Sequence, residues 1–291
     1  MKQGTTNVAA IYYKSLKNLK IGYPPIPEQQ RIVAILDQAF ANIEKARANA
    51  EQNLKNAREL FDSYLNQVFS SDDVVTESIN NWNCKSLNDI VNSVTIGLVK
   101  NSREQDPGFD YTYIKMNNIG NDNSFNLFKS AAVNASKEEI LKYCLQDNDV
   151  LFNTRNSVEL VGKSCLYRSW SDAPVLYNNN IARIRFKDEI SPAYAAYAFC
   201  SPFLKDQLES IKQGTTNVAA IYYKSLKNLK IGYPSITEQQ EIVEKLNQLS
   251  KRTEKLTASY KSKLNSLDEL KKSLLQKAFS GDLTKGEGRA A

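Results

Sequence analysis

Apolar residues recur at alternating intervals of three and four along two long stretches of the chain. The first stretch lies between Glu28 and the acidic pair at Asp72–Asp73 and contains neither glycine nor proline. This heptad spacing is typical of a coiled coil, so we predict a helix over residues 28–71. Arg47 interrupts its apolar seam, which otherwise consists of Val33, Leu36, Phe40, Ile43, Ala50, Leu54, Ala57, Phe61, Tyr64 and Val68.

The second stretch runs from Glu238 to about Ser280 and predicts a second helix over residues 237–281. Neither helix can bury an apolar stripe alone, and the segment between them carries the chain back. We therefore expect the two helices to pair as an antiparallel coiled coil. The second seam contains polar Thr253 and Lys263 among Leu246, Leu249, Leu256, Tyr260, Leu267, Leu270 and Leu274.

The segment between the two stretches has shorter patterns. The runs "YTYIKMNNI", "DVLFNT", "SCLYRSW" and "IARIRFK" alternate or are rich in β-formers, which predicts strands. The runs "SKEEILKYCL" and "SPAYAAYAFCSPFLKDQLESI" predict helices, with Ser136 and Ser191 as caps. We expect a globular α/β domain over residues 77–236, so that the whole chain has an α+β fold.

One segment occurs twice. "KQGTTNVAAIYYKSLKNLKIGYP" begins at Lys2 and again, letter for letter, at Lys212, and similarity continues without a gap to Ser70 and Ser280. Two copies of one unit therefore flank the unique segment, which is too long a period for a solenoid. We interpret residues 1–27 as the tail of a domain without its body, and residues 282–291 as a short C-terminal tail.

The composition argues against most catalytic chemistry. The chain has no histidine, which excludes imidazole bases, serine–histidine and cysteine–histidine pairs and histidine-containing metal sites. Neither a G-x-x-x-x-G-K-[ST] loop nor a [DN]-P-P-[YF] motif occurs. The acids Asp149 and Glu159 near Lys163 lack the Glu-x-Lys spacing of a nuclease. We predict a protein that is not an enzyme and needs no cofactor.

The spacing of the cysteines and the length of the apolar runs bear on where in the cell the protein is expected. The four cysteines lie far apart without CxxC spacing, which is typical of reduced thiols in the cytosol. No apolar run approaches the 18 or more residues that span a bilayer. We therefore expect a cytoplasmic protein that does not bind membranes.

The net charge of +6 is unevenly distributed. Each copy of the repeated segment carries four lysines and no acid, whereas residues 71–211 hold 14 basic and 18 acidic residues. The basic excess thus lies in the repeats. It fits a polyanionic partner, although lysines on a solvated face are the alternative.

Loops of the predicted domain are rich in side chains that can bind base edges and phosphates. They are "KNSREQ", "KMNN", "NTRNS", "YNNN" and "KQGTTN". In any single loop these residues could equally be turn formers. The candidate DNA contacts are Lys100, Asn101, Arg103, Lys115, Asn117, Asn118, Arg155, Asn156, Ser157, Asn179, Lys212, Gln213, Thr215 and Thr216.

Several motifs resemble one family. "YPPIPEQQRIVAILDQ" and "YPSITEQQEIVEKLNQL" resemble the strand-to-helix junction of type I restriction-modification specificity subunits. The resemblance extends through "WNCKSLNDIV", "LQDNDVLFNTRNSVELVGKSCLY", "NNNIARIRF", "YAAYAFCSPFLKDQLESIKQGTTNVAAI" and "LLQKAFSGDLT", in the family's order. It covers essentially the whole chain.

The resemblance implies a set of roles. In that family a target recognition domain binds half of a bipartite sequence in double-stranded DNA. Helical regions form a spacer on which methyltransferase subunits dock, and through them the restriction subunit. The family's usual order is domain, helix, domain, helix, whereas this chain has only the last residues of a first domain. We expect a non-catalytic specificity subunit with one recognition domain, acting as a homodimer on a palindromic bipartite target.

Two other functions remain open. A coiled-coil scaffolding or interaction protein without DNA recognition would show the same long helices. A methyltransferase or nuclease in its own right is disfavoured by the missing motifs.

Overall fold

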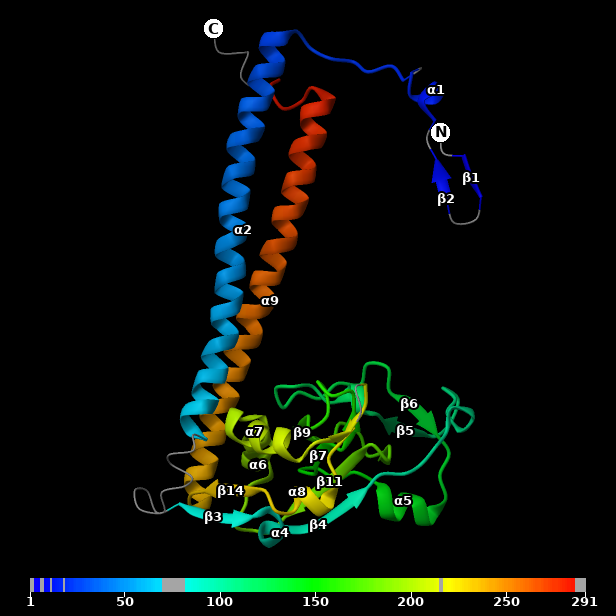
Figure 1. Ribbon diagram of the computed structural model, residues 1–291, viewed down its shortest axis with the longest axis vertical. Coiled ribbons are helices and arrows are strands. Elements are labelled where there is room, and N and C mark those ends of the chain that lie inside the picture. The colour runs from blue at the N-terminus through cyan, green and yellow to red at the C-terminus, as the bar shows by residue number, and fades with distance from the viewer. Residues whose placement is uncertain are drawn as a thin grey trace. The chain divides into compact units, whose positions relative to one another are not determined.

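The computed structural model describes residues 3–5, 8–10, 12–17, 19–69, 82–214 and 217–285 (Figure 1). The chain forms two compact units. The helical unit comprises Met1–Lys55 and Thr257–Ala291, and the domain unit comprises Asn56–Leu256. The domain start expected at residue 77 lies outside the described residues.

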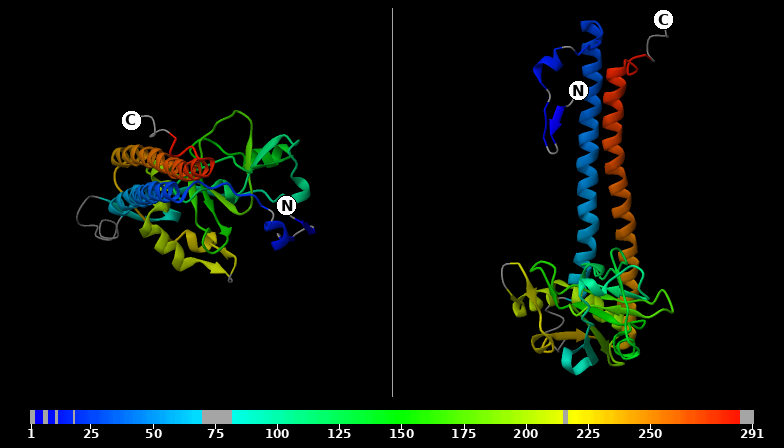
Figure 2. Two further views of the ribbon diagram at one scale, coloured as in Figure 1. Left: turned by 90° about the horizontal axis from the view of Figure 1, so that it is seen from above. Right: turned by 90° about the vertical axis from the view of Figure 1, so that its right-hand side faces the viewer.

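Two helices are much longer than the rest. Helix α2 spans Ile26–Val68 and helix α9 spans Ile236–Ser280, and they run side by side in Figures 1 and 2. In the helical unit Lys271 forms an ion pair with Glu44 at 2.9 Å, and Arg47 forms one with Asp268. As the residue number rises along α2, the number of its partner in α9 falls, so the two helices are antiparallel. The predicted antiparallel pairing and the α+β fold are confirmed.

The predicted seam of α9 is wrong on one side. Leu256 and Leu270 are 42% and 47% exposed and Lys263 is exposed, whereas Thr257 and Leu264 are half-buried. The predicted and the observed seam share positions such as Tyr260. The spacing of apolar residues alone is compatible with a seam through Lys263 or through Leu264 after it. The observed choice leaves the Lys263 ammonium in water and buries Leu264 in its place, which avoids the cost of an unpaired buried charge.

The predicted seam of α2 is wrong at its start. Val33 is 54% exposed. In the register set by the ion pairs of Glu44 and Arg47, α9 ends at Ser280 before it reaches Val33, so α9 does not cover that side chain. No helix among the described residues is long and apolar enough to cross a membrane.

The domain unit contains several small sheets. The largest has the order β4–β11–β7–β9, with every neighbouring pair antiparallel. A second has the order β10–β5–β6, and its β10–β5 pair is parallel. The third and fourth are β12–β13–β8 and β14–β3. The strand bounds are β3 Asn83–Ser86, β4 Val91–Ile96, β5 Tyr111–Ile114, β6 Ala131–Val133, β7 Val150–Asn153, β8 Arg155–Asn156, β9 Ser164–Leu166, β10 Val175–Tyr177, β11 Ile181–Phe186, β12 Gln213–Gly214, β13 Ala219–Ala220 and β14 Lys230–Tyr233.

Short helices connect these strands. Ser136 and Ser191 cap helices as predicted, with their hydroxyl oxygens accepting from the Glu139 and Tyr194 amides. The segment predicted as one helix after Ser191 is two, because Ser201 ends the first and Pro202 starts the second. The helix bounds are α4 Leu87–Ile90, η1 Ser102–Glu104, η2 Met116–Asn118, α5 Lys137–Tyr143, α6 Pro192–Cys200, α7 Pro202–Ile211 and α8 Tyr223–Leu226.

Helix α6 forms the centre of the main core, with every residue from Ala193 to Cys200 buried. Phe199 packs against Phe152 of β7 with ring centroids 5.4 Å apart. The end of α2 and the start of α9 contribute to the same core within the domain unit. So does the second copy of the repeated segment, through Ala219, Ile221, Leu226, Leu229, Ile231 and Tyr233.

The two copies of the repeat share part of their local structure, although their surroundings differ. The first forms β1 (Gln3–Thr5), β2 (Val8–Ala10) and α1 (Tyr13–Leu16), as β12, β13 and α8 do in the second. Ile231 is 1% exposed, whereas its counterpart Ile21 is 77% exposed. Residues 230–233 also form strand β14 by pairing with β3, whereas the identical residues 20–23 form no strand. Local sequence therefore determines the hairpin and the short helix, while tertiary contacts determine the last strand and the burial of the segment.

This pair allows a matched stability experiment. Ile231→Ala should lower the free energy of unfolding by about 2–5 kcal/mol, because it leaves a cavity in the core. Ile21→Ala should change it by less than about 0.5 kcal/mol. Denaturant unfolding of both variants measures the difference, and equal losses would contradict the packing described here.

Candidate nucleic-acid interface

One of the predicted DNA-binding residues is an internal anchor. The Asn118 side chain is fully buried, and its carbonyl oxygen accepts from the Lys115 amide at 2.8 Å. Its amide donates to the backbone oxygens of Asn126 and Phe128 at 2.9 and 3.1 Å. Asn118 thus joins η2 to the turn at residues 126–130. Its base contact stays a prediction, and this structure assigns the buried side chain to internal hydrogen bonds.

Asn180 connects η2 to the residues between strands β7 and β8. Its side-chain amide donates to the Met116 sulfur at 3.4 Å. Its backbone oxygen accepts from the Thr154 amide at 2.8 Å and from the Asn153 side chain at 3.0 Å. Three loops that are distant in sequence, around residues 116, 154 and 179, therefore form one continuous surface.

A cavity of about 240 Å³ lies on this surface, lined by Arg155 and Asn179. Both side chains are exposed, and neither has a hydrogen-bonding or ionic partner in the described part of the chain. The remaining lining residues are Ile96, Thr154, Asn180, Ala220, Ile221, Tyr222 and Tyr223. A guanidinium and an amide beside apolar walls can bind a base edge and a methyl group together.

Tyr222 is a member of this site that the sequence did not single out. Its side chain is 51% exposed although its neighbour Ile221 is buried. The identical copy places Tyr12 at the same position, so the sequence alone could not show which tyrosine lines a cavity. An exposed tyrosine can stack on a base or donate to a phosphate.

Among the described strands, β8 lies at the edge of its sheet and pairs with β13. Ala220 of β13 pairs with Arg155 on one side and with Gln213 of β12 on the other, which places exposed Gln213 one strand away from β8. The half-buried Asn156 donates to the Asn153 oxygen at 3.0 Å and accepts from the Ser157 amide at 2.9 Å. Asn156 and Ser157 thus shape the strand end. The predicted contacts Thr215 and Thr216 lie outside the described residues.

The loop at residues 100–105 adjoins the same surface through Gln105. The Gln105 amide donates to the backbone oxygens of Lys100 and Asn101, and its oxygen accepts from the Lys115 ammonium at 3.1 Å. The Lys100 side chain is only 12% exposed and pairs with Glu139 at 3.2 Å. Lys100 and Lys115 therefore hold the loop in place.

Other residues of these loops remain available. Asn101 caps η1 by accepting from the Arg103 amide at 2.9 Å, and it is exposed. Arg103 is exposed and has no side-chain partner among the described residues. Asn117 is exposed and donates to the Phe128 oxygen at 3.3 Å. Together with Arg155, Asn179 and Gln213, these residues form the exposed polar set of the surface.

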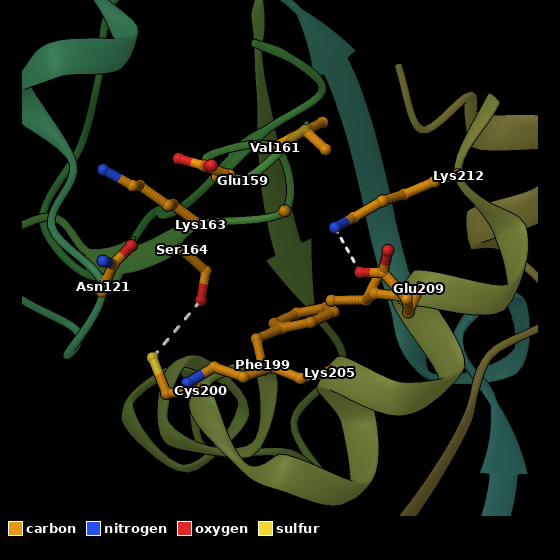
Figure 3. Close-up of a pocket in the computed structure, with 12 residues that line it drawn as sticks. Asn121, Glu159, Val161, Lys163, Ser164, Phe199, Cys200, Lys205, Glu209 and Lys212 are labelled. Carbon is orange, nitrogen blue, oxygen red and sulfur yellow. Dashed lines mark hydrogen bonds and ion pairs between the residues drawn. The ribbon is translucent and has the colours of Figure 1, made fainter. Parts of the chain in front are cut away.

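Lys212 belongs to a different cavity, of about 200 Å³ (Figure 3). Its ammonium pairs with Glu209 and donates to the Val158 oxygen at 3.0 Å. Lys163 and Glu159 line this cavity too, and burial lowers the pKa of Lys163. Lys212 is thus engaged within the protein.

The structure does not assemble the carboxylate–lysine group that Asp149 would need for nuclease chemistry. Asp149 is buried and forms an ion pair with Arg185 at 2.5 Å, while Glu159 and Lys163 line the cavity of Lys212. Among the described residues, no three cysteines or acids are grouped to hold a metal ion.

Comparison with known proteins identifies the family. Residues 2–52 and 79–266 match the family described as type I restriction modification DNA specificity domain, and the chain belongs to this family. It is 27% identical to the type I restriction enzyme EcoKI specificity subunit of Escherichia coli K12 over 96% of this chain and 61% of that subunit. It is 24% identical to the StySPI specificity subunit of Salmonella potsdam over 96% of this chain and 60% of that subunit.

Solved structures show the same fold. A chain from a structure of the type I R-M system superposes with a TM-score of 0.75 at 22% identity, covering 96% of this chain and 65% of that one. The HsdS subunit from Thermoanaerobacter tengcongensis superposes with a TM-score of 0.57 at 22% identity, covering 97% and 65%. This chain spans 45% to 61% of the length of the curated relatives it matches.

Asn118 is a buried anchor and Asn179 is exposed, so alanine substitutions at these two positions should differ in their effect on stability. Asn118→Ala should cost about 1–3 kcal/mol of stability, because it leaves buried backbone groups without partners. Asn179→Ala should stay within about 0.5 kcal/mol of the parent. Thermal unfolding compares them, and a stable Asn118→Ala variant would show that the turn does not depend on this side chain.

Proposed function

We propose that this chain is the DNA-specificity subunit of a type I restriction-modification complex and acts in the cytoplasm. One observation carries the proposal in a chain of this family: Arg155 of β8 and Asn179 of the loop after β10 line one cavity, and neither side chain has a partner among the described residues. We assign residues 77–236 to the recognition domain, 28–71 and 237–281 to spacer helices, and 1–27 and 282–291 to the tails. Methyl transfer and cleavage belong to other subunits.

Recognition follows from the chemistry of the exposed set. The Arg155 guanidinium can donate two parallel hydrogen bonds to guanine O6 and N7, and the Asn179 amide can pair with adenine N6 and N7. The apolar cavity wall, including Ile96, suits a thymine methyl group. Arg103, Asn117 and Gln213 lie where they can bind phosphates or neighbouring bases. Pairing with β13 fixes the backbone of Arg155, so little backbone order has to be created on binding.

Arg155→Ala should reduce discrimination at one base pair by about 1–3 kcal/mol. Arg168→Ala is the matched control, because Arg168 is exposed and pairs with Asp147 away from the cavity. Binding of the chain to duplex libraries at several salt concentrations measures both effects.

Each other outcome has a distinct meaning. An equal loss on all sequences would make Arg155 a phosphate contact, and no loss would remove it from the interface. A parent chain that binds no duplex, even at low salt, would favour the scaffolding alternative, since a DNA-binding subunit must show salt-dependent affinity.

We further propose that the spacer helices dock the methyltransferase subunits, and through them the restriction subunit. In the helical unit Leu270 and Phe279 of α9 are 47% and 89% exposed. A groove lined by α2 residues such as Ile35 and Ala39 lies in the same unit. Apolar side chains on a helix exterior indicate a partner. Because one recognition domain binds one half-site, we also propose a homodimer with a palindromic bipartite target.

Light scattering tests both assemblies. The chain should have the mass of two copies, and adding the methyltransferase subunit should increase it. Leu270→Glu should abolish the increase and keep the dimer, whereas Leu141→Glu on exposed α5 should change neither. A monomer at micromolar concentration, with or without the partner, would contradict the dimer. A dimer that persists without residues 1–25 would assign assembly to the helices.

A further inference from the structure

The turn at residues 126–130 presents an aromatic ring to solvent. Phe128 is 71% exposed, the most exposed aromatic side chain among the described residues of the domain unit, and Leu127 beside it is 41% exposed. Exposure of a large apolar ring is unfavourable in water. A turn that maintains it needs a structural cause and indicates something that covers the ring.

The cause is a network of hydrogen bonds. The Phe128 oxygen accepts from the side chains of Asn118 and Asn117, and the Phe128 amide donates to the Asn126 side chain at 3.0 Å. The backbone amide of Asn126 donates to the backbone oxygen of Asn118 at 3.0 Å. Because Asn118 is fully buried, these bonds fix the turn to the domain body. The ring is therefore held outward on a rigid support.

The next residue fixes the direction of the turn and supplies a charge. Lys129 has a φ of 58°, in the left-handed region that non-glycine residues rarely adopt. Its ammonium lies 5.1 Å from the centroid of the Phe128 ring. Residues 124–130 include no acid. The turn thus combines an apolar ring with an adjacent cation, which matches the stacked bases and the phosphates of a nucleic acid.

The turn adjoins the proposed recognition surface. Asn118, which holds the turn, belongs to η2, and Met116 of η2 accepts a hydrogen bond from Asn180. Asn180 lines the cavity with Arg155 and Asn179. A duplex bound at that cavity would therefore lie close to Phe128.

We infer that Phe128 inserts between adjacent base pairs of the bound duplex and unstacks one step beside the bases that Arg155 and Asn179 contact. This inference rests on the proposed DNA recognition. Apolar side chains that act in this way pry open a base step and bend the duplex. Pyrimidine–purine steps open most readily, so Phe128 would add a preference at a position that makes no hydrogen bond to the protein.

The test uses the full chain and a series of duplexes that carry its methylation motif, each with 2-aminopurine at one successive position. The fluorescence of 2-aminopurine rises when the base unstacks. The parent chain should raise it at one step only. Phe128→Ala should abolish the rise and weaken binding about tenfold. Phe128→Trp should restore both, and Leu141→Ala, an exposed leucine on α5, should match the parent.

The outcomes are distinguishable. Phe128→Ala removes no charge, so the salt dependence of its affinity should equal that of the parent. A parent that binds with that salt dependence and raises fluorescence at no position would overturn the insertion and leave DNA recognition intact. The same holds if Phe128→Ala keeps the rise. A parent that binds no duplex at any salt concentration would overturn the proposed function, and the insertion with it.

Discussion

The packing of residues 219–233 into the domain core is the constraint on which the recognition surface depends. β14 pairs with β3, and β13 pairs with β8, so one segment near the end of the domain braces both its first strand and the strand that carries Arg155. The Tyr194 hydroxyl, from buried α6, donates to the Gly232 oxygen at 2.8 Å and ties the segment to the central helix. Without these contacts β8 would lose its neighbour.

This dependence explains how exposed side chains can be selective. Discrimination between bases requires that donors be placed before DNA arrives, because ordering them on binding costs free energy. In this domain buried asparagines provide this order, because the side-chain amides of Asn153 and Asn118 donate hydrogen bonds to backbone oxygens. The Arg155 and Asn179 side chains, which have no partner among the described residues, then project from this fixed framework.

Long-range features with strong periodicity could be predicted from the sequence, including the two helices, their antiparallel pairing and most strands. The side of the α9 seam could not, because Leu256 and Leu264 fit the same heptad pattern. Loop residues were predicted by type, but their burial depends on distant partners: Asn118 on Asn126 and Lys100 on Glu139. The roles of Phe128 and Tyr222 could not be predicted, because the exposure of a single aromatic side chain produces no periodic pattern in the sequence.

The central claim is that one continuous surface, built from the loops around residues 116, 154 and 179, contacts DNA. Hydrogen exchange of the full chain with and without a duplex carrying its methylation motif tests it most directly. Our account predicts that the duplex slows exchange in residues 111–118, 126–130, 153–157 and 177–180. Slowing confined to α2 and α9, or to the cavity lined by Lys163 and Lys212, would contradict it.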